Sequence, residues 1–214
     1  MYLFLAIFIF LVITQIFMGI FASSVKRGLK KKYSYYLGEQ IEFNKILQTY
    51  QEEHPNLSIL ASDEINDVCI AENNLIIISK KSIYAKDLYS NFLLLFHLKL
   101  TNPSLKEVRN IYNYQSIVFL AQLFSLALFF ILNVIAGIVL ALAYILLALN
   151  IFLVVYGVLA YSKLLKEVLI DAKPILKLDK VEEARAETLM NEIKYEVLTY
   201  PLEIPWRLTR FWSI

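Results

Sequence analysis

The chain has little of several residue types, and each shortage excludes a class of protein. The single cysteine, Cys69, excludes a disulfide framework, and with only two histidines it cannot build a zinc finger. Five glycines in 214 residues give no glycine-rich phosphate-binding loop, and no G-x-S-x-G nucleophile elbow occurs. A net charge of +2 gives no reason to expect nucleic-acid binding. The composition, 58% hydrophobic and 19% charged, excludes a disordered chain.

Charged residues are missing from two long stretches. Residues 1–25 and 110–162 contain no Asp, Glu, Lys or Arg, so all 21 basic and 19 acidic residues lie in 26–109 and 163–214. A bilayer would require such stretches, because a charge at its centre costs about 2.5–3.5 kcal/mol. The pattern predicts a transmembrane anchor over 1–25, a cytoplasmic α+β unit over 26–109, a transmembrane helical hairpin over 110–162 and a cytoplasmic amphipathic helical tail over 163–214.

The uncharged stretches predict three membrane spans. Residues 2–21 match the roughly 20 helical residues that cross a bilayer once. A cleaved signal peptide is disfavoured, because no basic residue precedes the apolar run and the run exceeds the ~7–15 residues of a signal core. The second stretch would be ~80 Å long as one helix and must fold back. We expect the turn at Asn133 and Gly137, with spans near 117–132 and 138–159.

Basic residues next to these spans predict the orientation. Five of them directly follow the first span: Lys26, Arg27, Lys30, Lys31 and Lys32. Lys163 and Lys166 follow the third span, and Lys106 and Arg109 precede the second. The positive-inside rule then places the N-terminus outside the cell membrane and both charged regions in the cytoplasm. The five-residue cluster could also attract anionic lipid, although a topology signal is the simpler interpretation.

The segment 26–109 shows the spacing of a small α+β unit. Periodic apolar residues predict a helix over 38–51 that Pro55 ends, and 56–61 has the composition of a strand. The β-rich runs 68–71 and 75–78 flank Glu72-Asn73-Asn74 and predict a hairpin. A second helix is expected over 82–100, with Ser82 as its cap and Pro103 beyond its end. Its centre, Phe92–Phe96, is apolar all round and is therefore expected to be buried.

The hairpin sequence DVCIAENNLIIIS, from Asp67 to Ser79, resembles the DHYDPxNxxxxLS hairpin of the bacterial membrane-bound neutral zinc metallopeptidases. Asn73 falls on the Asn of that family. Gly38–Leu47 is similar to its GxxxAxxIL helix, and Ile78–Tyr84 looks like its LSxxVY run. The resemblance implies a zincin-like helix, hairpin and helix unit, with His97 at the position of the first zinc ligand.

The catalytic motif of that family is degenerate in this chain. HExGHAxQ reads HLKLTNPS at 97–104, so Leu98 replaces the general-base Glu and Thr101 replaces the second His. Two histidines four residues apart share a helix face and reach one Zn²⁺, and a lone histidine cannot do so. The third ligand of the family corresponds either to Glu203 or to Leu169. His97 is thus a vestigial metal-site position, and a hydrogen-bonded histidine of a buried helix is the simpler interpretation.

The C-terminal tail begins with helical spacing over 180–200, which Pro201 and Pro205 should end. The last residues combine aromatic and basic side chains that suit either the inner membrane interface or a protein core: Trp206, Arg207, Arg210 and Trp212.

The sequence predicts a catalytically inactive, metallopeptidase-like membrane protein, with no catalytic residue, metal or cofactor. It would act as a binding, adaptor or regulatory subunit of another membrane protein, with that protein and the lipid bilayer as its partners. Two alternatives stay open: an active membrane zinc metallopeptidase with displaced ligands, and an accessory subunit of a transport or secretion complex.

Overall fold

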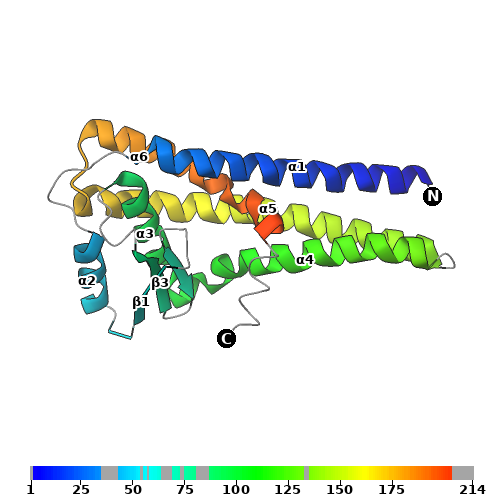
Figure 1. Ribbon diagram of the computed structural model, residues 1–214, viewed down its shortest axis with the longest axis horizontal. Helices are drawn as coiled ribbons and strands as arrows, with labels where there is room; N and C mark the ends of the chain where they lie inside the picture. The colour runs from blue at the N-terminus through cyan, green and yellow to red at the C-terminus, as the bar shows by residue number, and fades with distance from the viewer. Residues whose placement is uncertain are drawn as a thin grey trace. The chain divides into compact units, whose positions relative to one another are not determined.

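A computed structural model describes residues 2–34, 43–53, 55–56, 58–63, 69–72, 75–80, 87–132 and 135–203. The fold is mostly helical with a small sheet, as expected for an α+β chain (Figure 1). Its elements, in chain order, are α1 (Tyr2–Lys32), α2 (Phe43–Glu53), β1 (Ser58–Ser62), β2 (Cys69–Glu72), β3 (Leu75–Ser79), α3 (Leu88–Leu100), the 3-10 helix η2 (Pro103–Leu105), α4 (Lys106–Ile131), α5 (Ala136–Ile175), α6 (Lys180–Ile193) and the 3-10 helix η4 (Lys194–Glu203).

The chain divides into two compact units. The first, here called the uncharged-helix unit, consists of Met1–Val25, Asn110–Leu159 and Tyr195–Ile214. The second, the charged unit, consists of Lys26–Arg109 and Ala160–Lys194. Two of the limits, after Val25 and after Arg109, fall where the uncharged stretches end and begin in the sequence.

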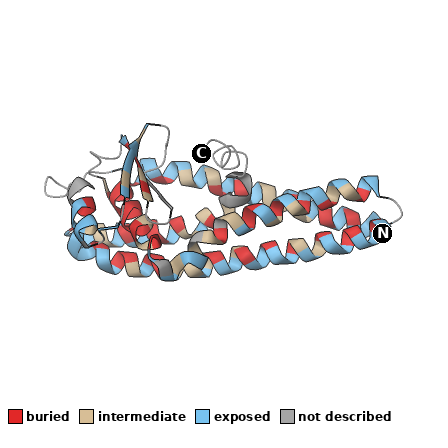
Figure 2. Ribbon diagram, turned by 90° about the horizontal axis from the view of Figure 1, so that it is seen from below, coloured by how far each residue is buried: buried red, intermediate tan, exposed pale blue. Residues whose placement is uncertain are grey.

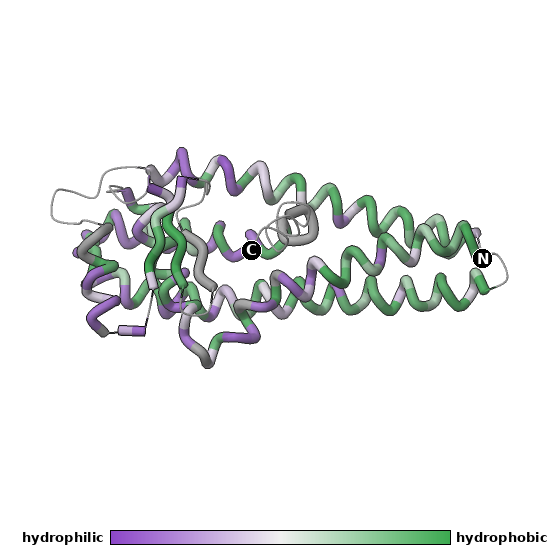
Figure 3. The backbone as a smooth tube through the Cα atoms, turned by 60° about the horizontal axis from the view of Figure 1, so that its bottom comes forward, coloured by the Kyte–Doolittle hydropathy of each residue, from purple (hydrophilic) through white to green (hydrophobic). Residues whose placement is uncertain are grey.

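The uncharged-helix unit contains the apolar parts of three long helices. The helices α1, α4 and α5 are each long and apolar enough to cross a membrane, and the hydropathy colouring of Figure 3 shows the apolar residues along them. Large apolar side chains on their outer surfaces are exposed: Phe4, Phe10, Phe17, Phe21, Ile117, Phe124, Phe130, Ile138, Ile145 and Phe152. Soluble proteins rarely expose apolar patches larger than a few hundred Å². This surface is therefore suited to lipid.

Smaller and aromatic side chains join the three helices inside this unit. Phe8 is fully buried in a core with Phe129, Val139 and Ala143. The ring of Phe8 lies edge-on to that of Tyr144, with centroids 5.5 Å apart. The Tyr144 hydroxyl donates a hydrogen bond to the carbonyl of Phe4 at 2.7 Å. Buried positions therefore alternate with exposed ones along the same helices, as Figure 2 shows.

The turn between α4 and α5 differs from the prediction in one residue. The helix α4 ends at Ile131, and the amide of Ile135 donates to the carbonyl of Leu132 at 3.2 Å. The helix α5 begins at Ala136, so Gly137 lies in its first turn and not in the reversal. The structure does not require a glycine at position 137, because a Cβ added there would meet nothing within 4 Å. Asn133 lies outside the described residues.

The sheet of the charged unit confirms the predicted hairpin. The strands β2 and β3 pair antiparallel, with Cys69 opposite Ile78 and Glu72 opposite Leu75. The strand β1 pairs with β3 in parallel, which gives the order β1-β3-β2. Alternate residues of β3 lie on opposite faces, and Ile76 and Ile78 are buried. The hairpin signals could not predict the β1–β3 pairing, because it joins segments that are distant in sequence.

The helix α3 starts later than predicted, and its cap is Asp87. The Asp87 carboxylate accepts hydrogen bonds from the Ser90 amide at 2.8 Å and from the Ser90 hydroxyl at 2.9 Å. These bonds satisfy one of the amides that a helix start leaves without a partner. The predicted cap, Ser82, lies outside the described residues, and the helix begins six residues after it at Leu88. Phe92–Phe96 is buried throughout, as predicted.

The predicted tail helix is shorter than expected. The Asp179 side chain caps α6 by accepting from the amides of Val181 and Glu182, while Glu182 accepts from the Asp179 amide. The α-helix ends at Ile193, and a 3-10 helix continues through Pro201. Val181, in the first turn of α6, is 59% exposed, whereas Leu189 and Ile193 are buried.

Candidate functional site

The end of α3 carries residues 97–101, the segment that the sequence resemblance aligned with a zinc-peptidase motif. The ring of His97 is half-buried and lies edge-on to Phe96, with centroids 5.5 Å apart. Leu98 is buried, and its carbonyl accepts hydrogen bonds from the Thr101 hydroxyl at 2.6 Å and from the Tyr50 hydroxyl at 2.9 Å. The position of the family's second histidine is thus occupied by a residue that ends the helix.

Lys99, in the same segment, forms ion pairs with α5. Its amine lies 2.5 Å from the Asp171 carboxylate and 3.8 Å from that of Glu167. The two acids are four residues apart on one helix and so lie on one face. These two carboxylates are therefore paired with a cation of the segment itself.

The described residues contain no group of three or more His, Cys, Asp or Glu that could hold a metal ion. Leu169, one of the two positions aligned with the family's third ligand, is buried in α5. The other, Glu203, is the last residue of η4.

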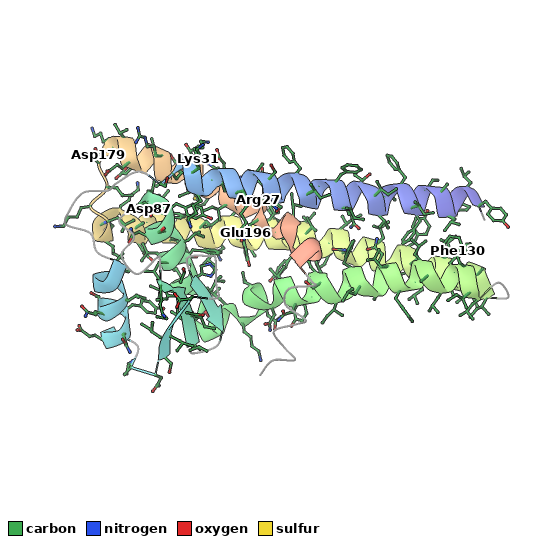
Figure 4. The ribbon with its side chains drawn as sticks, in the orientation of Figure 1. Arg27, Lys31, Asp87, Phe130, Asp179 and Glu196 are labelled. Atoms are coloured by element: carbon green, nitrogen blue, oxygen red, sulfur yellow. The ribbon has the colours of Figure 1, made fainter. Side chains whose placement is uncertain are left out.

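The five basic residues predicted at the end of the first span all lie in the last turns of α1. Lys32 donates to the Glu192 carboxylate at 2.5 Å, and its amine lies 5.0 Å from the centroid of the Tyr33 ring. Lys26 is half-buried, and the other four are exposed. Figure 4 labels Arg27 and Lys31 on this helix. The other predicted interface residues lie outside the described ranges: Trp206, Arg207, Arg210 and Trp212.

A chain of buried amides crosses the uncharged-helix unit, and sequence reasoning missed it. The side-chain NH₂ group of Gln122 in α4 donates to the side-chain oxygen of Gln15 in α1 at 3.2 Å. The Asn150 amide of α5 donates to Gln122 at 3.5 Å, and both of these side chains are fully buried. The side-chain oxygen of Asn150 has no partner in the described part of the chain. The available signal was a lone amide in each of three apolar runs (ITQIF, LAQLF and ALNIF).

A second buried amide joins η4 to the same unit. In its hydrogen-bonding orientation, the Gln115 side chain donates to the Val197 carbonyl at 3.1 Å and accepts from the Val154 amide at 3.2 Å. Val197 is fully buried next to Gly157, where a Cβ would lie 2.7 Å from a Val197 methyl group. The start of this 3-10 helix therefore packs with the uncharged helices, whereas the sequence placed all of 163–214 in a separate tail.

The chain was compared with known proteins on three levels. No protein-family model matches it, and neither a curated protein nor a solved structure does.

Proposed function

We propose that this chain is a non-catalytic integral membrane protein that presents its charged unit to the cytoplasm as a binding or regulatory subunit of another membrane protein. The membrane part of the proposal is supported by the three apolar helices and by the large apolar side chains on their outer surfaces. The orientation is supported by the basic residues that follow the first and third uncharged stretches.

The pairing of Lys99 is the observation that carries the non-catalytic part. A zinc peptidase needs about three protein ligands and a base that takes a proton from the bound water. In HLKLT the amine of Lys99 neutralises Asp171 and the Thr101 hydroxyl is bonded to the Leu98 carbonyl. Lys99 thereby engages the two carboxylates beside it, and Leu98 cannot accept a proton. The Lys99 ion pair and the Thr101 hydrogen bond help to fix the end of α3, and they support a structural role for residues 97–101.

The binding part is supported by the edge and one face of the sheet. The strand β1 lies at an edge of the described sheet, and edge strands can pair with an extended segment of a partner. Leu60 of β1 is 53% exposed, and it lies on the same face as the half-buried Ile77 because these residues are opposite each other in the register. An open strand edge with an exposed apolar side chain beside it is suited to an extended segment of a protein partner.

A photo-crosslinking residue at Leu60 tests this surface in intact membranes. We expect a cross-link to one membrane protein, identified by mass spectrometry. The same residue at Glu187, which is exposed on α6, is the matched control and should give no such product. Equal products from both positions would contradict a binding surface at β1.

Zinc content and peptide hydrolysis test the non-catalytic part. We expect no stoichiometric zinc, no hydrolysis in the purified chain, and unchanged biological activity in His97→Ala. One zinc per chain, lost in His97→Ala together with hydrolysis, would establish the active metallopeptidase instead.

Cysteine labelling with a membrane-impermeant reagent tests the orientation in a Cys69→Ser background. Gly137→Cys should be labelled in intact cells and Lys180→Cys only after lysis; the reverse would place the charged unit outside.

A further inference from the structure

The basic residues of the charged unit fall into two groups by their partners. Several lysines of this unit form ion pairs with carboxylates: Lys32 with Glu192, Lys80 with Asp63, Lys99 with Asp171 and Glu167, and Lys173 with Glu183. Within the described residues, Arg27, Lys30 and Lys31 have no carboxylate partner, although all three are exposed. They occupy the first two turns after the uncharged stretch 1–25.

These three cations share one face of α1. Their spacing of three and four residues places neighbouring side chains about one helical turn apart. The surface at this turn is open, because a Cβ added at Gly28 would meet nothing within 4 Å. Residues 26–32 contain no acidic side chain. A ligand of opposite charge can therefore reach all three cations without displacing an internal ion pair.

The other two long helices carry exposed lysines at the corresponding places in the sequence. Lys163 and Lys166 of α5 follow the second uncharged stretch, and Lys106 of α4 precedes it. Among acidic residues that form no described ion pair, Glu107 is the closest in sequence to these lysines. One flank of each of the three apolar segments is thus predominantly basic.

We propose that Arg27, Lys30 and Lys31 bind the phosphate of an anionic phospholipid headgroup. A guanidinium can hold a phosphate with two parallel hydrogen bonds, and ammonium groups add charge without fixing its orientation. Clusters of Lys and Arg directly beside a membrane span attract anionic lipid. The lipid supplies the anion, because residues 26–32 contain no acidic side chain and no described ion pair joins these three cations to a carboxylate. The proposal rests on the membrane placement proposed above, and not on the absence of catalysis.

The test measures lipid binding to the full chain in nanodiscs of phosphatidylcholine with a minor fraction of phosphatidylglycerol. Lipids retained on the released protein are counted by native mass spectrometry. We expect phosphatidylglycerol to be enriched over its bulk fraction. The triple variant Arg27→Gln, Lys30→Gln and Lys31→Gln should lose roughly tenfold or more of this preference, from the combined attraction of three basic residues. Lys30→Arg with Lys31→Arg keeps the charges and should keep the preference.

A second triple variant, Lys177→Gln, Lys180→Gln and Arg185→Gln, removes the same charge far from the uncharged stretches and should leave the preference unchanged. An equal loss in both triple variants would overturn the site, because net charge alone would then explain the binding. Displacement of the lipid by millimolar inorganic phosphate would also overturn it, in favour of a soluble anion. Vesicle flotation separates the two proposals: a chain that does not float refutes the membrane placement, whereas a chain that floats without lipid preference refutes only this site.

Discussion

Replacing Gln122 by Leu should destabilise the uncharged-helix unit, and the size of the effect follows from its two hydrogen bonds. Gln122 links α1 to α5 by donating to Gln15 at 3.2 Å and accepting from Asn150 at 3.5 Å. Hydrogen bonds between membrane helices contribute about 0.6 kcal/mol on average and up to about 1.7 kcal/mol. Losing both should cost about 1–3 kcal/mol, because the fully buried Asn150 side chain then has no partner for its amide or its oxygen.

Asn150→Leu should have a much smaller effect. The single bond that it removes is long, and the substitution also removes a buried oxygen that has no partner among the described residues. Gln122 then has the unpaired oxygen in place of Asn150, so the number of unpaired buried acceptors does not change. We expect the stability to stay within about 1 kcal/mol of the native chain.

Equilibrium unfolding by SDS in mixed micelles, followed by circular dichroism, measures both variants. Ser125→Ala is a suitable control, because among the described residues the Ser125 hydroxyl donates only to the carbonyl of Ala121 in its own helix. The order expected is a clear loss for Gln122→Leu and little change for the other two. If Asn150→Leu costs as much as Gln122→Leu, the central role of Gln122 in the amide chain is wrong.

Three further substitutions test the packing. Gly157→Ala places a methyl group 2.7 Å from Val197 and should cost about 1–3 kcal/mol in the same SDS titration; an unchanged midpoint would show that η4 does not pack there. Asp87→Ala removes the cap that accepts from Ser90 and should lower stability by about 0.5–2 kcal/mol, whereas Asp87→Asn should retain most of it. Leu94→Asp buries a charge at a fully buried position and should abolish the folded charged unit at a cost of several kcal/mol; native resistance to limited proteolysis would contradict this.

Local patterns predicted the elements of the chain well. The lack of charges identified three helices of sufficient length, and the two β-rich runs around Glu72-Asn73-Asn74 identified the hairpin. The continuous apolar run Phe92–Phe96 identified a buried helix. In each case the signal lies within about twenty neighbouring residues, where periodicity and turn chemistry act.

The errors came from contacts that are distant in sequence. The parallel pairing of β1 with β3 depends on how the chain passes from one edge of the sheet to the other, which no local pattern records. The packing of Val197 beside Gly157 is a tertiary contact, and it overrides the helical spacing that predicted one helix through residue 200. The cap of α3 was misassigned because both Ser82 and Asp87 have suitable side chains, and only the start of the helix decides between them.

The candidate site was harder to predict than the fold. The sequence singled out residues 97–101 as a candidate segment, which stays a prediction, but it did not show that Asp171 and Glu167 of another helix are the partners of Lys99. The sequence also gave the positions of the basic residues of α1. It did not show that Lys32 forms an ion pair with Glu192 whereas Arg27 forms no described ion pair. A residue's charge can be read from the sequence, but whether that charge is already neutralised depends on the fold.

The interleaved order of the two units has a consequence for biosynthesis. The charged unit is completed by Ala160–Lys194, which the ribosome makes only after residues 110–159. The ring of Phe96 in α3 lies 5.3 Å from that of Tyr161, and Lys99 pairs with Asp171, which is 72 residues downstream. Until that part of the chain emerges, α3 lacks the part of its cover that residues 160–194 supply, although the sheet is already present. A nascent chain that stops before residue 160 should therefore be held by chaperones or degraded, and maturation of the charged unit would report that the preceding hairpin helices have already been synthesised.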